Sequence, residues 1–424
     1  MIGAVASALF VLLAASIPVA SVLFILAFGV DFFYSPFPLT RGLGQIVWSS
    51  SDSALLTAIP FFILLGEILV RSGIAQRTYA ALDAWAAWAP GGLIHANIGT
   101  ATLFAATSGS SVATAATVAT VAMPQAEKLN YDPRLFAGSI AAGGTLGIMI
   151  PPSINLIVYG FLTETSVPRL FLAGLVPGLL MAAMFMVITA ILCSLYPNLG
   201  GPQRTASWVD RLRALAELVP IAILFLSVVG TIYLGLATPT EAAALGVAMA
   251  FAIAGARRTL TWRGTCEALV GTVRVTSMIM FVILGAYFLN FALVAAGVGA
   301  KLIQFLDNLG LSPFGTLLSI VALYILLGFF METLSLMVAT IPIVVPIVVG
   351  VGYDKVWFGI LMILLVEMAL ITPPVGLNLY VVQAVRGSGR LTQVMMGVIP
   401  YVFAMLLMAA LLIAFPQLAL WLPG

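Results

Sequence analysis

The sequence predicts an all-α polytopic membrane protein made of inverted repeats, each with a re-entrant hairpin and a broken helix. Three observations support this fold class. Of the 424 residues, 62% are hydrophobic and only 8% are charged, whereas soluble domains carry roughly 25% charged residues. Glycine and proline, at 39 and 23 residues, interrupt the apolar segments, and broken helices in lipid must line something polar. Finally, the two halves of the chain share a pattern of residues.

The composition also limits the kinds of site. The single histidine, His95, and the two cysteines, Cys193 and Cys266, cannot form a Cys/His metal centre, so we expect no transition metal and no cofactor. A net charge of +2 indicates no nucleic-acid partner. The chain offers no Ser/His/Asp set beyond a histidine at the edge of an apolar segment. We therefore do not expect an enzyme.

The apolar segments define the elements. A straight span takes about 20 residues, so the segments 93–125 and 311–350 are too long for one span, and each predicts a hairpin of two arms. The segments 135–162 and 356–385 each contain a Pro-Pro pair, which predicts a broken helix.

We interpret residues 1–424 as a single membrane domain with three parts. The first repeat spans 53–196, a connecting segment with two helices spans 197–266, and the second repeat spans 267–421.

Five features recur in register between the two halves. Three recur 222 residues apart, and two recur 223 apart because one residue is inserted after the second Pro-Pro pair. Chance is a poor explanation for five matches in register, so we infer a true internal repeat. The matches are Pro124 with Pro346, Tyr131-Asp132 with Tyr353-Asp354, Pro151-Pro152 with Pro373-Pro374, Asn155 with Asn378, and Gly174-x-x-Pro177 with Gly397-x-x-Pro400.

Counting membrane crossings predicts that the repeats are inverted. Each repeat makes three net crossings, because its hairpin enters and leaves on the same side. With the two connecting helices, the second repeat begins five crossings after the first. Five is odd, so the second repeat starts on the opposite side of the membrane. The basic residues in loops 204–213 and 257–263 satisfy the positive-inside rule if both loops are cytoplasmic. Inverted repeats with discontinuous helices are typical of secondary transporters.

The first hairpin and the first broken helix predict a sodium site. The prolines remove backbone donors and free the carbonyl groups of the preceding turn, and nearby hydroxyl and amide oxygens would complete an oxygen shell. The small residues of the hairpin have an alternative explanation, which is close helix packing. The predicted ligands are Ser108, Gly109, Ser110, Pro151, Ser153 and Asn155.

Pseudo-symmetry predicts a second sodium site in the second repeat. Its predicted ligands are Glu332, Thr333, Thr372, Pro373, Gly376 and Asn378.

The space between the hairpin tips is the predicted substrate site. Half-helices that begin after each break direct the positive ends of their dipoles toward the middle of the membrane, where they can hold an anionic group such as a carboxylate. The predicted substrate-binding residues are Ser110, Ser111, Ser153, Ser335 and Thr372.

Four acidic residues lie in or beside apolar segments, where an ionisable group is a functional candidate by default. Glu332 at a hairpin tip and Glu367 just before the second break are candidates for a site or gating role. For Glu67 and Glu241 we favour structural roles, and for Arg274 a snorkelling position at the interface.

Several of these motifs resemble the large membrane subunit of tripartite ATP-independent periplasmic (TRAP) transporters. The resemblance covers about residues 53–415. The motifs that carry it are Ile59 to Glu67 (IPFFILLGE), Ser108 to Ser111 (SGSS), Gly143 to Asn155 (GGTLGIMIPPSIN) with Tyr159-Gly160, and Leu370 to Asn378 (LITPPVGLN).

The resemblance implies more than the spacing does. It implies import of an organic acid across the bacterial inner membrane by an elevator-type movement, driven by Na⁺. It also implies two partners, a periplasmic substrate-binding protein and a small membrane subunit of four helices. One apolar segment precedes residue 53, so we expect the small subunit to be a separate chain. Many relatives carry an acid shortly after the serine motif, whereas this chain has Thr114 and Thr117 there.

Three alternatives stay open. The chain could be a self-sufficient ion-coupled carboxylate transporter that needs no binding protein, and uptake by the chain alone would identify it. A channel would also use broken helices, although channels more often form as symmetric oligomers of small repeats. An intramembrane enzyme would need a nucleophile and base set that the composition does not offer.

Overall fold

The computed structural model describes residues 17–35, 38–297, 310–329 and 331–424, together with a few positions before residue 17. This part of the chain forms helices and contains no strand. Seven of the described helices are long and apolar enough to cross a membrane, and the bent pair Pro133–Met149 and Ile154–Thr163 would make an eighth span. The structure thus confirms the predicted all-α membrane fold.

The first half of the chain begins with short helices and continues into the predicted first repeat. The N-terminal elements are α2 (Val19–Tyr34), η1 (Leu39–Gly42) and α3 (Leu43–Ser51). They are followed by α4 (Ala54–Arg71), α5 (Ile74–Ala86), α6 (Leu93–Ser108), α7 (Ser111–Lys128), α8 (Pro133–Met149), α9 (Ile154–Thr163), α10 (Val167–Leu195) and η2 (Pro197–Leu199).

The second half contains the connecting helices and the predicted second repeat. The connecting helices are α11 (Trp208–Tyr233) and α12 (Pro239–Ala256). The remaining helices are α13 (Trp262–Ala295), α15 (Pro313–Gly328), α16 (Thr333–Gly350), α17 (Lys355–Ala369), α18 (Leu377–Arg386), α19 (Leu391–Ala414) and α20 (Gln417–Leu420).

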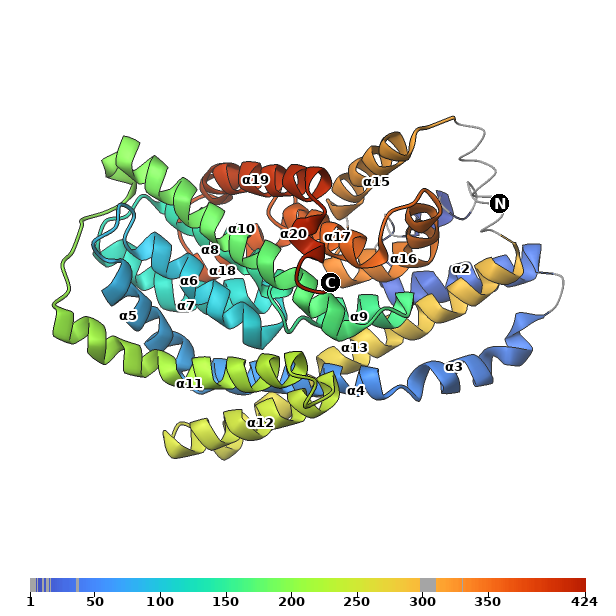
Figure 1. Ribbon diagram of the computed structural model, residues 1–424, viewed down its shortest axis with the longest axis horizontal. Helices are drawn as coiled ribbons and strands as arrows, with labels where there is room; N and C mark the ends of the chain where they lie inside the picture. The colour runs from blue at the N-terminus through green and yellow to red at the C-terminus, as the bar shows by residue number, and fades with distance from the viewer. Residues whose placement is uncertain are drawn as a thin grey trace.

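The helices form two groups. We call α2, α4, α11, α12 and α13 the frame, because α13 packs along α2 and α4, and α12 packs along α4 and α11. We call α6–α10 and α15–α19 the hairpin body. Figure 1 shows α4, α11 and α12 along the lower edge of the molecule, α13 and α2 toward the right, and most of the hairpin body above α4 and α11. The predicted hairpins and broken helices thus lie together in one body, although they come from both halves of the chain.

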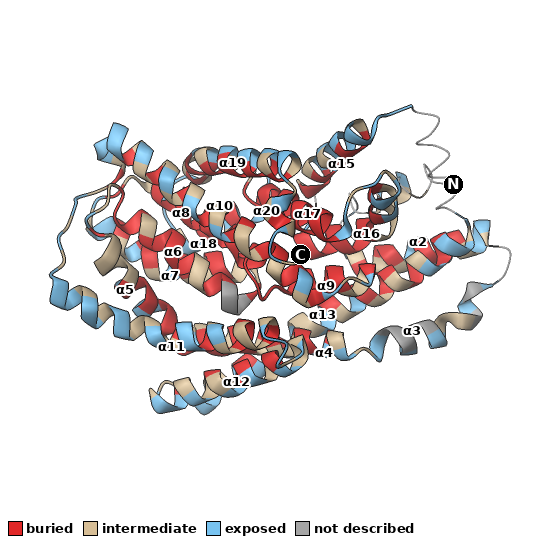
Figure 2. Ribbon diagram, in the orientation of Figure 1, coloured by how far each residue is buried: buried red, intermediate tan, exposed pale blue. Residues whose placement is uncertain are grey.

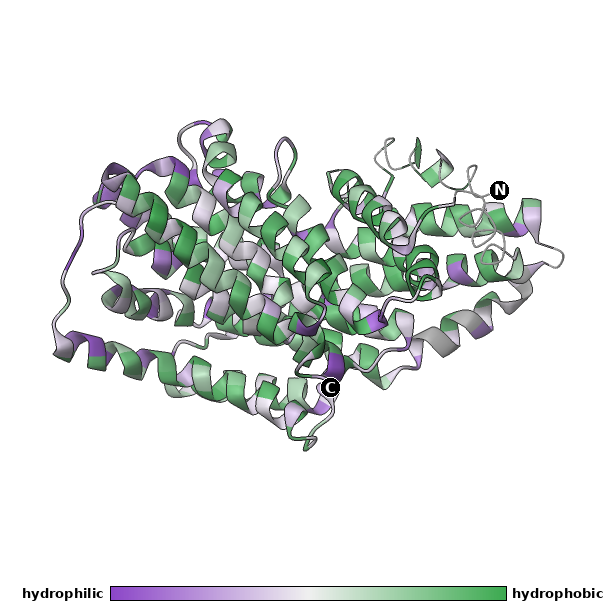
Figure 3. Cartoon of the chain, turned by 45° about the horizontal axis from the view of Figure 1, so that its top comes forward, coloured by the Kyte–Doolittle hydropathy of each residue, from purple (hydrophilic) through white to green (hydrophobic). Residues whose placement is uncertain are grey.

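The centre of the hairpin body is formed by α8 and α17. Residues 135–149 of α8 and residues 356–369 of α17 are all buried, as Figure 2 shows. The frame helices instead expose apolar side chains, such as Leu226 of α11 and Met278 of α13. Figure 3 shows hydrophobic residues along most of the helices and polar residues gathered near helix ends and loops. This is the distribution expected where lipid surrounds the outer helices.

The repeated Tyr-Asp motif has the same structural role in both halves. The Asp132 carboxylate accepts hydrogen bonds from the backbone N–H groups of Arg134 and Leu135 and caps α8. The Asp354 carboxylate caps α17 in the same way, at 2.7 Å from the backbone nitrogen of Val356. An N-cap satisfies backbone donors that have no partner inside the helix. The two central helices therefore begin at matched positions of the sequence repeat.

Glycines allow α8 to pack closely on all sides. Gly138 lies against Gly397 of α19, and Gly143 lies against Ala101 of α6. A Cβ on Gly147 would stand 2.9 Å from the carbonyl oxygen of Ser110, at the start of α7. Small residues let helix backbones approach in membranes, so these glycines bring the first hairpin onto the first broken helix.

Candidate functional site

The tip of the first hairpin lies against the first break. Gly109 ends α6 with a left-handed φ of 57°, and the Ser110 hydroxyl caps α7 by accepting a hydrogen bond from the backbone of Ala113. A Cβ on Gly109 would stand 3.2 Å from Cγ1 of Ile154, the first residue of α9. The predicted ligands Gly109 and Ser110 are therefore brought to the break, while the side chain of Ser108 lies outside the described part of the structure.

The first break is closed off from the surroundings. Residues 150–155 are all buried, including Pro151 and Ser153. The Ser153 hydroxyl caps α9 by accepting from the backbone nitrogen of Leu156 at 3.4 Å. The buried Asn155 side chain has an amide nitrogen without a hydrogen-bonding partner among the described residues. A buried donor without a partner favours an anionic ligand, because an anion would satisfy it.

The tip of the second hairpin packs on the second broken helix. Gly328, at the end of α15, lies against Ala369, at the end of α17. The Glu332 carboxylate caps α16 by accepting from the backbone nitrogen of Ser335 at 3.1 Å. Thr333 is buried, and its hydroxyl oxygen has no hydrogen-bonding partner among the described residues. Ser335, a predicted substrate residue, lies two residues after Thr333 and is also buried.

The second break is more open than the first. Thr372 and Pro373 are half-buried, and Pro374 is exposed. The Thr372 hydroxyl donates to the carbonyl oxygen of Met368 at 2.6 Å, which leaves its lone pairs available to a ligand. Gly376, the residue before α18, has a positive φ of 39° and is buried. The two breaks match in sequence but differ in exposure.

Asn378 connects the two halves of the molecule. Its amide nitrogen donates to the carbonyl oxygen of Ala141 in α8 at 3.3 Å, and its amide oxygen is buried without a partner among the described residues. A Cβ on Gly144 would stand 3.0 Å from both the Asn378 amide nitrogen and the Ser111 carbonyl oxygen. Asn378, predicted for the second site, thus lies beside the start of α7 in the first repeat.

Glu367 joins the two hairpins. Its carboxylate is fully buried in α17 and accepts a hydrogen bond from the hydroxyl of Ser111, the first residue of α7. It also lies near the Glu332 carboxylate, and the Thr333 hydroxyl at the second hairpin tip is close enough to interact with it. One carboxylate oxygen has no hydrogen-bonding partner among the described residues. Ser111, which was predicted to bind substrate, therefore donates its hydroxyl hydrogen bond to Glu367.

We call Ser111, Thr333, Glu367 and Asn378 the central cluster. Its members come from α7, α16, α17 and α18, so both repeats contribute. Three of its buried oxygens, on Thr333, Glu367 and Asn378, lack a hydrogen bond of normal geometry among the described residues, although Thr333 lies close to Glu367. Buried acceptors without a partner are costly, and a cation or a proton would satisfy them. The cluster thus offers buried acceptor oxygens to a cation or a proton.

The sequence indicated Glu367 only in part. An acid inside an apolar segment one turn before a Pro-Pro break is a visible signal. Its partner Ser111 lies 256 residues away, and no spacing rule predicts that contact. The other two acids have local partners. Glu67 pairs with Arg71, and Glu241 caps α12 in a capping box with Thr238.

Comparison with known proteins gives the chain a family context. Residues 6–418 match the family model described as "Tripartite ATP-independent periplasmic transporter, DctM component". The chain is 34% identical to the C4-dicarboxylate TRAP transporter large permease protein DctM of Pseudomonas aeruginosa, over 91% of this chain and 90% of that protein. It is 32% identical to the sialic acid TRAP transporter large permease protein SiaM of Vibrio cholerae, over 88% and 87% of the two chains.

A solved structure shares the fold. The YdaH transporter of Alcanivorax borkumensis, described as having an unusual topology, superposes with a TM-score of 0.66 and covers 98% of each chain. The sequence identity is 14%, so this likeness concerns the fold alone.

Proposed function

This chain belongs to the DctM family of tripartite ATP-independent periplasmic transporters and is a multi-pass protein of the bacterial inner membrane, and from this premise we propose that it imports an organic acid with Na⁺ as the coupling ion. The observation that carries the proposal is the central cluster. Three buried oxygens, on Thr333, Glu367 and Asn378 of the second repeat, lie in this cluster with Ser111 of the first repeat, and such oxygens meet the needs of a bare cation in a membrane.

We assign one Na⁺, that of the site predicted in the second repeat, to the central cluster and to the neighbouring residues of the second break. Thr333, Glu367 and Asn378 supply oxygens. Thr372, which lies between Glu367 and Asn378 in the sequence, has lone pairs available as well. Another Na⁺, at the site predicted in the first repeat, would lie near Ser110, Pro151 and Ser153 and follows from the sequence repeat. The Asn155 side chain at that break has an amide oxygen that can serve as a ligand beside backbone carbonyls and hydroxyls.

The substrate in this proposal is a carboxylate. The relatives transport C4-dicarboxylates in one case and sialic acid in another, according to their names, and both are carboxylic acids. The free donor of Asn155 and the N-termini of α7 and α9 favour an anion at the first hairpin tip. The substrate would thus lie between the two hairpin tips, with Ser110, Ser111, Ser153, Ser335 and Thr372 around it.

The proposed transport cycle moves the hairpin body against the frame. Both hairpins and both broken helices lie in the hairpin body, so the two ion sites and the substrate would travel together. The two partners in this proposal are a small four-helix membrane subunit that extends the frame and a periplasmic protein that delivers the substrate. Membership of a family of tripartite transporters supports the existence of both partners.

Reconstitution in liposomes tests the proposal. The chain is reconstituted alone, with its small membrane subunit, and with that subunit and the binding protein outside. Uptake of labelled C4-dicarboxylate and labelled sialic acid is measured with an inward Na⁺ gradient or an equal K⁺ gradient. We expect uptake only with all three components and Na⁺. Uptake by the chain alone would identify a self-sufficient transporter, and equal uptake in K⁺ would refute sodium coupling.

A further inference from the structure

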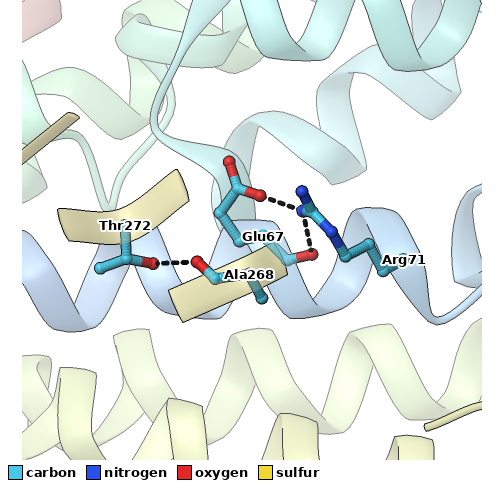
Figure 4. A network of polar contacts seen from close by, with 4 residues as sticks. All are labelled: Glu67, Arg71, Ala268 and Thr272. Atoms are coloured by element: carbon cyan, nitrogen blue, oxygen red, sulfur yellow. Dashed lines mark hydrogen bonds and ion pairs between the residues drawn. The ribbon is translucent and has the colours of Figure 1, made fainter. Parts of the chain in front are cut away.

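A basic crevice lies on the frame, away from the central cluster. It has a volume of about 410 Å³ and follows one face of the first three turns of α13, beside the end of α4. Figure 4 shows this junction, with Glu67 and Arg71 of α4 next to Ala268 and Thr272 of α13. The crevice is lined by Arg71, Arg263, Cys266, Glu267, Val270, Gly271 and Arg274.

The charges in the crevice leave one arginine free. The Glu67 carboxylate packs on Gly271, where a Cβ would stand 3.1 Å from it, and pairs with Arg71. Glu267 pairs with Arg263 at 2.9 Å. Arg274 is exposed and forms no ion pair or hydrogen bond with any residue that the structure describes. Both acids are thus neutralised locally, and the guanidinium of Arg274 carries the net positive charge.

The length of α13 places the crevice at the level of lipid headgroups. Its 34 residues span about 51 Å, whereas the hydrocarbon core of a bilayer is about 30 Å thick. Residues 275–295 contain no charged residue, so they form the hydrocarbon-spanning part, and Arg274 marks its edge. Beyond it, α13 exposes Met278 and Phe281. The basic loop 257–263 places this end of α13 at the cytoplasmic face.

We propose that this crevice binds the phosphate of an anionic phospholipid from the cytoplasmic leaflet. The planar Arg274 guanidinium matches phosphate oxygens in a two-pronged geometry. Arg71 and Arg263, whose charges are offset by Glu67 and Glu267, lie on either side with N–H groups outside their ion pairs. The acyl chains lie along the exposed apolar face near Met278 and Phe281, which a soluble anion would leave uncovered. The lipid would hold α4 and α13 together on the frame, independently of the transported substrate.

Cys266 provides a native reporter for this site. It lines the crevice and is half-exposed, whereas the other cysteine, Cys193, is buried. The chain with its small membrane subunit is placed in nanodiscs of phosphatidylcholine with increasing phosphatidylglycerol, and labelling by an uncharged maleimide is followed. We expect phosphatidylglycerol to slow labelling of Cys266. Arg274→Gln should shift the midpoint of protection about fivefold to higher phosphatidylglycerol content.

Controls separate the lipid from other ligands. Arg390→Gln removes another exposed arginine outside the crevice and should leave the midpoint unchanged. Cys266→Ser reports labelling at other sites. Equal protection in Arg274→Gln and the unmodified chain would refute the proposal. Protection by inorganic phosphate in pure phosphatidylcholine would identify a soluble anion instead, and protection by the small subunit without phosphatidylglycerol would identify a protein contact. Either result would overturn the lipid assignment.

Discussion

Asn378 uses the two ends of its amide for different purposes. The nitrogen holds the carbonyl oxygen of Ala141 in the other repeat, and the buried oxygen remains free for an ion. A single side chain can therefore affect both the packing of the hairpin body and the coupling ion. This dual role changes what a substitution at Asn378 is expected to do.

We expect Asn378→Ala to lower stability and to weaken sodium activation. Loss of the amide removes the added hydrogen bond to the Ala141 carbonyl oxygen, which keeps its partner within α8, and this costs about 0.5–1.5 kcal/mol. Thermal unfolding in detergent measures the first effect, and the Na⁺ concentration for half-maximal uptake measures the second. Thr120→Ala is the control, because that exposed hydroxyl bonds only to Ala116 of its own helix. An unchanged Na⁺ requirement would exclude Asn378 from the ion site.

Glu367 is the residue at which charge matters most in our proposal. Glu367→Gln keeps the shape of the side chain and can still accept the hydrogen bond of Ser111, but it removes the negative charge. We expect sodium-driven uptake to fall about tenfold or more, the effect of losing at least 1.4 kcal/mol of ion binding, with little change in thermal stability. Glu127→Gln, on the exposed end of α7, should leave uptake unchanged. Normal uptake by Glu367→Gln would contradict a role in coupling.

At the scale of elements, α8 is packed against other helices on all sides. Its glycines face α6, α7, α18 and α19, and each final helix of a repeat reaches the broken helix of the other repeat through a glycine. Gly397 of α19 lies on Arg134 and Gly138 of α8. Gly174 of α10 lies mainly on Met149 of α8 in its own repeat, and a Cβ there would stand 3.6 Å from Ile360 of α17. Gly397 therefore makes the closer contact between the two halves.

Gly138→Ala tests this packing. A Cβ at this position would collide with the backbone of Gly397, which cannot move aside as a flexible side chain can. We expect the free energy of unfolding to fall by about 1–3 kcal/mol, the usual cost of overpacking. Gly230→Ala in α11 is the matched control, since a Cβ there meets nothing within 4 Å. Equal melting temperatures for the two variants would show that α8 and α19 do not pack as described.

At the scale of the whole molecule, the proposed movement predicts which contacts must break. Phe161 of α9 and Tyr287 of α13 join the hairpin body to the frame, with ring centroids 5.1 Å apart. Phe24 of α2 and Phe281 of α13 lie 5.3 Å apart, and both belong to the frame. The two pairs are similarly spaced, so they give a matched comparison.

We expect a short thiol cross-link between Phe161→Cys and Tyr287→Cys to abolish uptake, because it fixes the body to the frame. The same cross-link between Phe24→Cys and Phe281→Cys should leave uptake intact. Both variants are made without the native cysteines, and uptake is measured before and after a reducible cross-linker and again after reduction. Uptake that persists in the first variant, with cross-linking complete, would refute movement of the hairpin body against the frame.

The sequence by itself determined the membrane fold and the positions of the elements, because these follow from local chemistry. A low supply of charge excludes a soluble surface, paired prolines break helices, and Asp132 and Asp354 start α8 and α17 at matched positions. The repeat also indicated the hairpin tips and Asn378. All of these signals lie within a few residues of each other or recur in register.

Only the tertiary structure decided which polar atoms meet and which remain free. Ser111 donates to Glu367 across 256 residues, Asn378 reaches α8, and the second break is more exposed than the first despite matching prolines. Hydrogen bonding and burial depend on how whole helices pack, and packing through glycines such as Gly144 is set by surfaces from both halves of the chain. A linear pattern specifies the oxygens that are present, whereas the packed helices determine which of them are left for an ion.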